Sequence, residues 1–125
     1  MTGRLFALAL LVATAAARAQ PPAIDHGKEV FEHYCKPCHG DGRGDDGAPM
    51  LPGTHALTLK YRGQKPGLLE RRDDLPADLI KAVVRSGVAS MPPFRKTEVT
   101  DADLEAVAAY LADSAKRHNE EEARK

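Results

Sequence analysis

The sequence predicts an all-α domain of three to four short helices. Apolar residues recur at the spacing of one helix face in three stretches, which cover residues 25–34, 76–86 and 101–111. The stretch around the two cysteines contains no apolar run of the kind that forms a strand. A chain of 125 residues also has room for only one domain.

Residues 1–19 have the features of a secretory signal peptide. Arg4 supplies the positive start, residues 5–17 are apolar or small, and Ala17-Arg18-Ala19 fits the A-x-A pattern of a cleavage site. The apolar run is short for a membrane span, although an uncleaved anchor is the alternative. We expect cleavage after Ala19 and export of residues 20–125, without stable insertion in a membrane.

The exported chain is nearly neutral and poor in aromatic residues. Two of the 18 basic residues fall in the signal peptide, so 16 remain against 18 acidic residues. This balance gives no support to nucleic-acid binding or to attachment at a membrane surface. The chain has no tryptophan, and so short a chain has a thin core of its own. We therefore expect a bound apolar group to complete the core, and the protein without it to fold poorly.

The first predicted helix follows a Pro-rich lead-in. It begins at Asp25, whose carboxylate suits the N-cap position, and it runs to about Tyr34. Val30 and Phe31 share one face with Tyr34 and are expected to face the core.

The middle of the chain is expected to hold loops and one further helix. Residues 40–53 are rich in glycine, proline and aspartate and are predicted to be a loop. Residues 54–61 are either a short helix or irregular, and residues 62–72 are predicted to be a surface loop. Residues 76–86 predict a helix with proline at its first position and Gly87 as its C-cap. Its inner face is expected to hold Leu79, Ile80, Val83 and Val84.

The last predicted helix has the clearest pattern. Thr100 and Asp103 resemble a capping box, with Asp103 in place of the usual glutamate. Tyr110 is expected near the edge of the buried face, and residues 116–125 are expected to fray because most are charged. The buried face is expected to hold Leu104, Val107, Ala108 and Leu111. The predicted organisation is a signal peptide over residues 1–19, a folded domain over 20–116 and a charged tail over 117–125.

The strongest motif is the run Cys35-Lys36-Pro37-Cys38-His39, which has the C-x-x-C-H pattern of a c-type haem attachment site. Residues at i and i+3 lie on one side of a helical turn, so Cys35 and Cys38 can each bond one vinyl group of a single porphyrin. His39 follows directly and can place its ring under the iron as the proximal ligand. We expect one covalently bound haem c, which is normally attached in the bacterial periplasm.

Three other uses of paired cysteines fit the sequence less well. A thioredoxin-like dithiol needs a βαβ setting, and a structural zinc site needs further ligands although the chain has no third cysteine. A disulfide between Cys35 and Cys38 would close a very small loop and stabilise little.

The second face of the iron also needs a ligand, and Met91 is the best candidate. It lies far enough along the chain for a helix to wrap the porphyrin, and the two prolines that follow it keep residues 89–96 extended and stiff. Met50 lies inside the loop that must first leave the proximal side. A bis-histidine haem with His55 stays open, as does a purely structural role for Met91 in the core.

Three runs together resemble the class I c-type cytochromes over residues 25–114: C-K-P-C-H, A-S-M-P-P-F and T-D-A-D-L-E-A-V-A-A-Y-L. The longer run V-V-R-S-G-V-A-S-M-P-P-F-R-K-T-E-V-T-D is similar to the small cytochrome subunits of flavocytochromes such as p-cresol methylhydroxylase. The resemblance implies a class I cytochrome c fold, in which the first and last helices cross and short helices wrap one covalently bound haem. The sequence departs from the smallest family members by a longer segment over residues 54–72.

The resemblance also implies further residues at the haem. The Pro49 carbonyl is expected to accept the hydrogen bond of His39 Nδ1 and so to fix the ring. Tyr61 and Arg62, in the longer segment, are candidates for contacts with the haem propionates.

These ligands imply electron transfer. A thioether opposite an imidazole favours Fe(II), and two filled axial positions leave no site for oxygen or peroxide. We expect a periplasmic carrier, not an enzyme, that accepts single electrons from a flavin or quinoprotein dehydrogenase, freely or as its subunit, and passes them to a downstream acceptor. Residues 48–51 and 89–94 are expected to border the exposed haem edge. A peroxidase-like haem enzyme and a haem-based ligand sensor are the alternatives.

Overall fold

Helices make up nearly all the regular structure of residues 22–125, the part of the chain that the computed structural model describes. Helix α1 (Pro22–Val30) continues through a π-helical turn, η1 (Phe31–Cys35), into α2 (Lys36–His39). The remaining elements are α3 (Pro52–Tyr61), the 3-10 turn η2 (Leu69–Arg71), α4 (Ala77–Ser86) and α5 (Asp101–Glu122). The predicted all-α fold is confirmed, while the predicted signal peptide lies outside the described residues.

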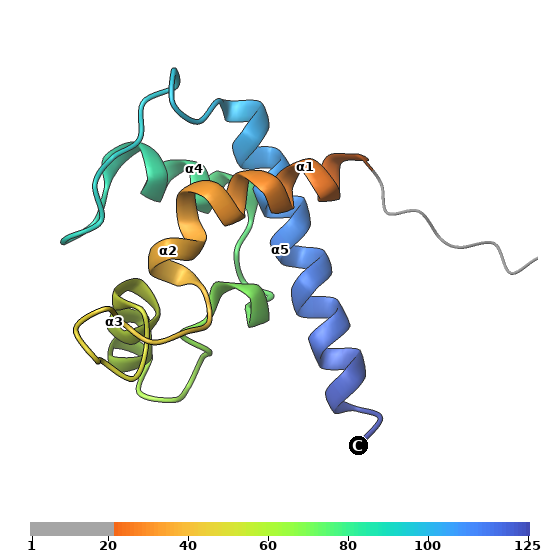
Figure 1. The fold of residues 1–125 in the computed structure, drawn as a ribbon. Coiled ribbons are helices and arrows are strands. Elements are labelled where there is room, and N and C mark those ends of the chain that lie inside the picture. Colours follow the sequence, from red (N-terminus) through yellow and green to blue (C-terminus); the bar gives the residue numbers. More distant parts are fainter. Residues whose placement is uncertain (1–21) are drawn as a thin grey trace, which may run out of the picture.

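The first and last helices cross in close contact (Figure 1). Gly27 of α1 makes this contact possible, because a β-carbon there would lie 1.9 Å from the carbonyl oxygen of Ala106 in α5. Two helices whose backbones approach so closely need a residue without a side chain at the contact. The crossing that the family resemblance implied is therefore confirmed.

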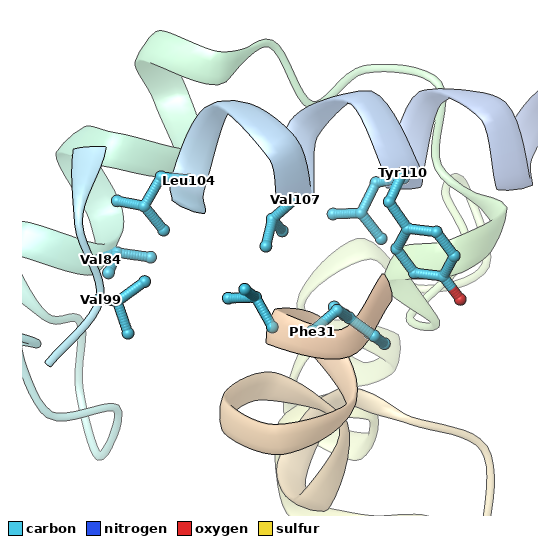
Figure 2. Packing of buried hydrophobic residues seen from close by; sticks show 8 residues of the cluster. Phe31, Val84, Val99, Leu104, Val107 and Tyr110 are labelled. Carbon is cyan, nitrogen blue, oxygen red and sulfur yellow. The ribbon is translucent and has the colours of Figure 1, made fainter. Parts of the chain in front are cut away.

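The hydrophobic core lies where α4 and the end of α1 meet α5. Figure 2 shows side chains of α5 pointing toward Phe31, with Val84 and Val99 beside Leu104 at one end of the cluster. The ring of Phe31 lies 5.5 Å from that of Tyr110, at an angle of 47°. The buried residues of this cluster are Val30, Phe31, Val84, Val99, Leu104, Val107, Tyr110 and Leu111.

The prediction that Tyr110 lies near the edge of the buried face of its helix is wrong. Its side chain is only 4% exposed, and its hydroxyl donates a hydrogen bond to Glu70 of η2. The sequence gives no sign of η2, and it is this turn that covers the tyrosine.

The first helix differs from the prediction at both ends. It is already helical at Pro22, so Asp25 lies in its first turn instead of capping it, where a negative charge still suits the helix dipole. At the other end the helical path does not stop at Tyr34 but continues through η1 and α2 to His39.

The last helix is longer than predicted. The capping box is confirmed, since Asp103 N donates to Thr100 Oγ1 and Thr100 N donates to the Asp103 carboxylate. The fraying predicted for residues 116–125 is wrong as far as Glu122, where α5 ends. Buried Ser114 and Ala115 anchor this part, and ion pairs one helical turn apart support it.

The middle of the chain confirms some predictions and corrects others. The ambiguous stretch after the loop is helix α3, and Gly87 does cap α4, although Pro76 is the N-cap and not the first helical residue. Leu79, predicted to face inward, is 44% exposed. The prediction of a surface loop over residues 62–72 is wrong in part, because Arg72 is buried and η2 packs on α5.

Within residues 22–125, no helix has both the length and the apolar character that a bilayer crossing requires.

Candidate functional site

The two cysteines lie where the first helical segment changes its winding. Cys35 is the last residue of η1, and Lys36 N donates to Phe31 O, five residues back. Pro37 lacks an amide hydrogen and so cannot make the regular α-helical bond to His33, which accounts for the wider turn here. The local sequence thus determines how Cys35 and Cys38 are placed along the helical path.

The two thiols are free and differ in burial. Cys35 packs against the hydrophobic core, whereas Cys38 is exposed. Burial, together with the neighbouring Cys38, raises the pKa of Cys35 to about 11, so this thiol is protonated at neutral pH. A group bonded to both sulfurs would therefore reach from the core to the surface.

The ring of His39 is pressed against the start of α3. A β-carbon at Gly53 would lie 2.7 Å from both Cε1 and Nδ1 of His39, so only glycine fits there. Nδ1 is buried without a hydrogen-bond partner. The hydrogen bond expected to the Pro49 carbonyl is therefore not formed. Burial lowers the pKa of His39 and favours the neutral imidazole, the form that binds a metal ion.

Helix α3 is itself tied to the end of α2. The buried Thr54 hydroxyl donates to Gly40 O at 2.9 Å, one residue after His39. Thr58 Oγ1 lies 3.6 Å from Met50 Sδ, so Met50 contacts the same helix as the His39 ring. This contact on the His39 side argues against Met50 as the opposite ligand.

Met91 lies at the end of a tight turn. Val88 and Met91 exchange two backbone hydrogen bonds, of 3.1 and 2.9 Å, and Ala89 within the turn has a φ of 50°. The partly buried Met91 packs against the same core cluster as Cys35. Figure 1 shows α2 between α3 and the α4 side of the molecule, to which this turn belongs.

An aromatic contact joins the helical segment that carries the cysteines to the segment that carries Met91. Tyr34, next to Cys35, meets Phe94 edge to face at a centroid distance of 6.1 Å. Phe94 lies three residues after Met91, so the helix with the cysteines and the segment with Met91 are in direct contact.

Tyr61 and Arg62 lie apart from these residues, at the end of α3. Arg62 is the C-cap, exposed and with a φ of 49°. The guanidinium of Arg72 stacks 4.6 Å from the Tyr61 ring and lowers the pKa of that hydroxyl. Arg72 also donates to Asp74 at 2.7 and 2.8 Å, which holds the pKa of that carboxyl well below its usual range.

Sequence reasoning missed two of these residues. Arg72 is only 5% exposed, and the run R-R-D-D over residues 71–74 was the available sign of its ion pair. Gly53 lies directly after Pro52 in a glycine-rich stretch, and nothing local distinguishes it from the other glycines. Its role depends on the ring of His39, which only the fold brings to it.

The donor set fits a haem. Two free thiols one helical turn apart, a neutral imidazole beside them and a thioether on a stiff segment are the groups that bond and ligate haem c. Among the described residues, no group of three or more His, Cys, Asp and Glu side chains could hold a metal ion. The fold and these groups define the class of a c-type cytochrome.

Comparison with known proteins identifies the family. Residues 22–111 match the family described as "Cytochrome C oxidase, cbb3-type, subunit III", and the chain belongs to this cytochrome c family. It is 28% identical over 94 residues to cytochrome c6 of Cyanidioschyzon merolae, covering 75% of this chain and 77% of that protein. It is 31% identical over 94 residues to cytochrome c6 of Synechocystis sp., covering 75% and 68%. The protein is thus a class I c-type electron-transfer cytochrome with one covalently bound haem c.

Proposed function

We propose that this cytochrome works in the periplasm, accepts single electrons from a flavin or quinoprotein dehydrogenase and passes them to a downstream acceptor. The observation that carries the proposal is the C-x-x-C-H run, whose His39 is packed on α3 while Cys35 shares a core cluster with Met91. The likeness of the Met91 region to flavocytochrome subunits supports the choice of donor, freely diffusing or as a permanent partner.

In this proposal each residue of the site has one role. Cys35 and Cys38 would hold the porphyrin through thioether bonds, and His39 and Met91 would bind the iron. Gly53 lets α3 lie against the imidazole, which restricts its rotation. The bound haem supplies one-electron exchange between Fe(III) and Fe(II), and a weakly donating thioether favours the reduced form.

The ring of His39 is then oriented by packing instead of by a hydrogen bond. Pro49 is exposed and belongs to residues 48–51, which we propose border the haem edge together with residues 89–94. Tyr61 and Arg62 are proposed for the haem propionates, with Arg72 holding the Tyr61 ring by stacking on it.

Export completes the proposal. Cleavage after Ala19 would leave a cytochrome domain of residues 20–116 and a charged tail of residues 117–125. The intact mass of the exported protein tests this directly, since it should equal that of the chain from Gln20 plus one haem.

Optical spectra of matched variants test the ligands. Met91→Leu should abolish the weak near-infrared band of methionine-ligated ferric haem and lower the reduction potential, because the thioether favours Fe(II). Met50→Leu is the control and should keep both. A Met91→Leu spectrum equal to that of the wild type would refute the assignment.

Two further measurements separate the proposed function from its alternatives. Rapid binding of carbon monoxide to the native reduced protein would reveal an open axial site and favour a haem enzyme or ligand sensor. Reduction by a flavoprotein or quinoprotein dehydrogenase from the same cells, at a rate that saturates with cytochrome concentration, is expected for the carrier.

A further inference from the structure

Arg85 of α4 joins three parts of the chain that follow Met91. Its Nη1 donates to Phe94 O at 2.9 Å, and its Nη2 donates to Val99 O and Asp101 Oδ1, each at 2.8 Å. A single side chain thereby ties residues 94–101 to α4.

The same segment is also bound to α4 through the backbone. Phe94 N donates to Val84 O at 2.9 Å. At Gly87, a β-carbon would lie 2.7 Å from Met91 O and 3.0 Å from Pro93 N, so the chain passes very close to the end of the helix. Met91 therefore lies between two attachments, its own turn with Val88 on one side and the attachment at Phe94 on the other.

The chemistry of Arg85 suits it to this task. Its side chain is 22% exposed, and its Nε is buried without a partner, so the guanidinium is largely removed from water. A planar guanidinium presents several donors in a fixed geometry, which lysine cannot reproduce. The contacts at Phe94 and Val99 are to main-chain oxygens, so they fix the path of the segment whatever its side chains are.

From these contacts we propose that Arg85 is the positioning residue for Met91 as an iron ligand. It holds residues 94–101 on α4, so that the Met91 thioether would keep one position relative to the iron and would return to it after dissociating. The inference rests on the proposed role of Met91. Without Arg85, the ligand-off form becomes more populated although the fold is kept.

A competing ligand measures that population. Imidazole binds the ferric iron only when the methionine is off, so its apparent affinity rises with the fraction of the open form. For Arg85→Gln we expect the apparent affinity of the holoprotein for imidazole to rise about tenfold, equivalent to about 1.4 kcal/mol.

Arg95→Gln is the matched control. Arg95 lies in the same segment, carries the same charge and is 80% exposed in an ion pair with Glu98. Its described hydrogen bonds and its ion pair stay within residues 95–99, so its removal should leave imidazole affinity unchanged. Arg85→Lys keeps the charge but loses the planar fork, and it should lie between wild type and Arg85→Gln.

The outcomes separate the two proposals. Imidazole affinity of Arg85→Gln equal to that of Arg95→Gln overturns the role of Arg85. If far-ultraviolet circular dichroism shows that Arg85→Gln does not fold, the imidazole affinity of Arg85→Lys is compared with that of Arg95→Gln instead, and equal affinities again overturn the role of Arg85. If Met91→Leu keeps the near-infrared band, the ligand assignment itself fails, whatever the Arg85 variants do.

Discussion

The substitution Gly27→Ala, at the crossing of α1 and α5, has two opposite effects on the stability of the protein. In the interior of an exposed helix, this change stabilises by about 1 kcal/mol, because alanine has the higher helix propensity. Here the new β-carbon would lie 1.9 Å from Ala106 O and 3.0 Å from Val107 N, both main-chain atoms that cannot rotate away. The helices would have to separate by roughly 1 Å, a gap that forfeits up to about half of the dispersion energy of each contact across it.

The steric effect should win. Overpacking costs about 1–3 kcal/mol and is often larger against a rigid backbone, so we expect a net destabilisation of about 2 kcal/mol. For a domain of this size the melting temperature should fall by roughly 10 °C. The loss arises because Phe31 and Val107, which are buried at the crossing, lose contact with each other's helix.

Thermal unfolding of the ferric holoprotein, followed by far-ultraviolet circular dichroism, measures this effect. Glu29→Ala, at an exposed site two residues along α1, is the control and should change the melting temperature little. A Gly27→Ala protein as stable as the wild type would show that the two helices do not touch as described.

Three further predictions concern other contacts. Thr54→Val removes the buried hydrogen bond to Gly40 O and should cost about 1–2 kcal/mol in chemical unfolding, whereas Thr97→Val at an exposed site should cost little. Asp101 has its pKa lowered from 3.8 to about 2, first by Arg85, so its contribution to stability is present above about pH 4 and is lost as the pH falls toward 2. Asp101→Asn should therefore reduce the loss of stability over that range, and an unchanged pH profile would contradict the pairing. Protein made without haem attachment should lack a cooperative thermal transition, because the small core alone does not stabilise the fold.

The sequence was most informative at positions where the physics is local. The capping box at Thr100 and the glycine cap of α4 follow from hydrogen bonds within a few residues, and both are confirmed. The C-x-x-C-H run likewise carries its chemistry in its own spacing. By contrast, the burial of Arg72 is not predictable from its neighbours in sequence, because the Tyr61 ring on which it stacks comes close only in the folded chain.

By itself the sequence determined the helical class, the haem-binding motif and the methionine candidate, because helical periodicity and residue chemistry are properties of short stretches. Only the tertiary structure decided that Gly53 lies against His39 and that Arg85 fastens the segment after Met91. These contacts join residues 9 to 16 positions apart, in different segments of the fold, and they depend on how those segments pack together. No local pattern encodes that fit, since a glycine or an arginine looks the same in sequence whether it faces water or a partner brought to it by the fold.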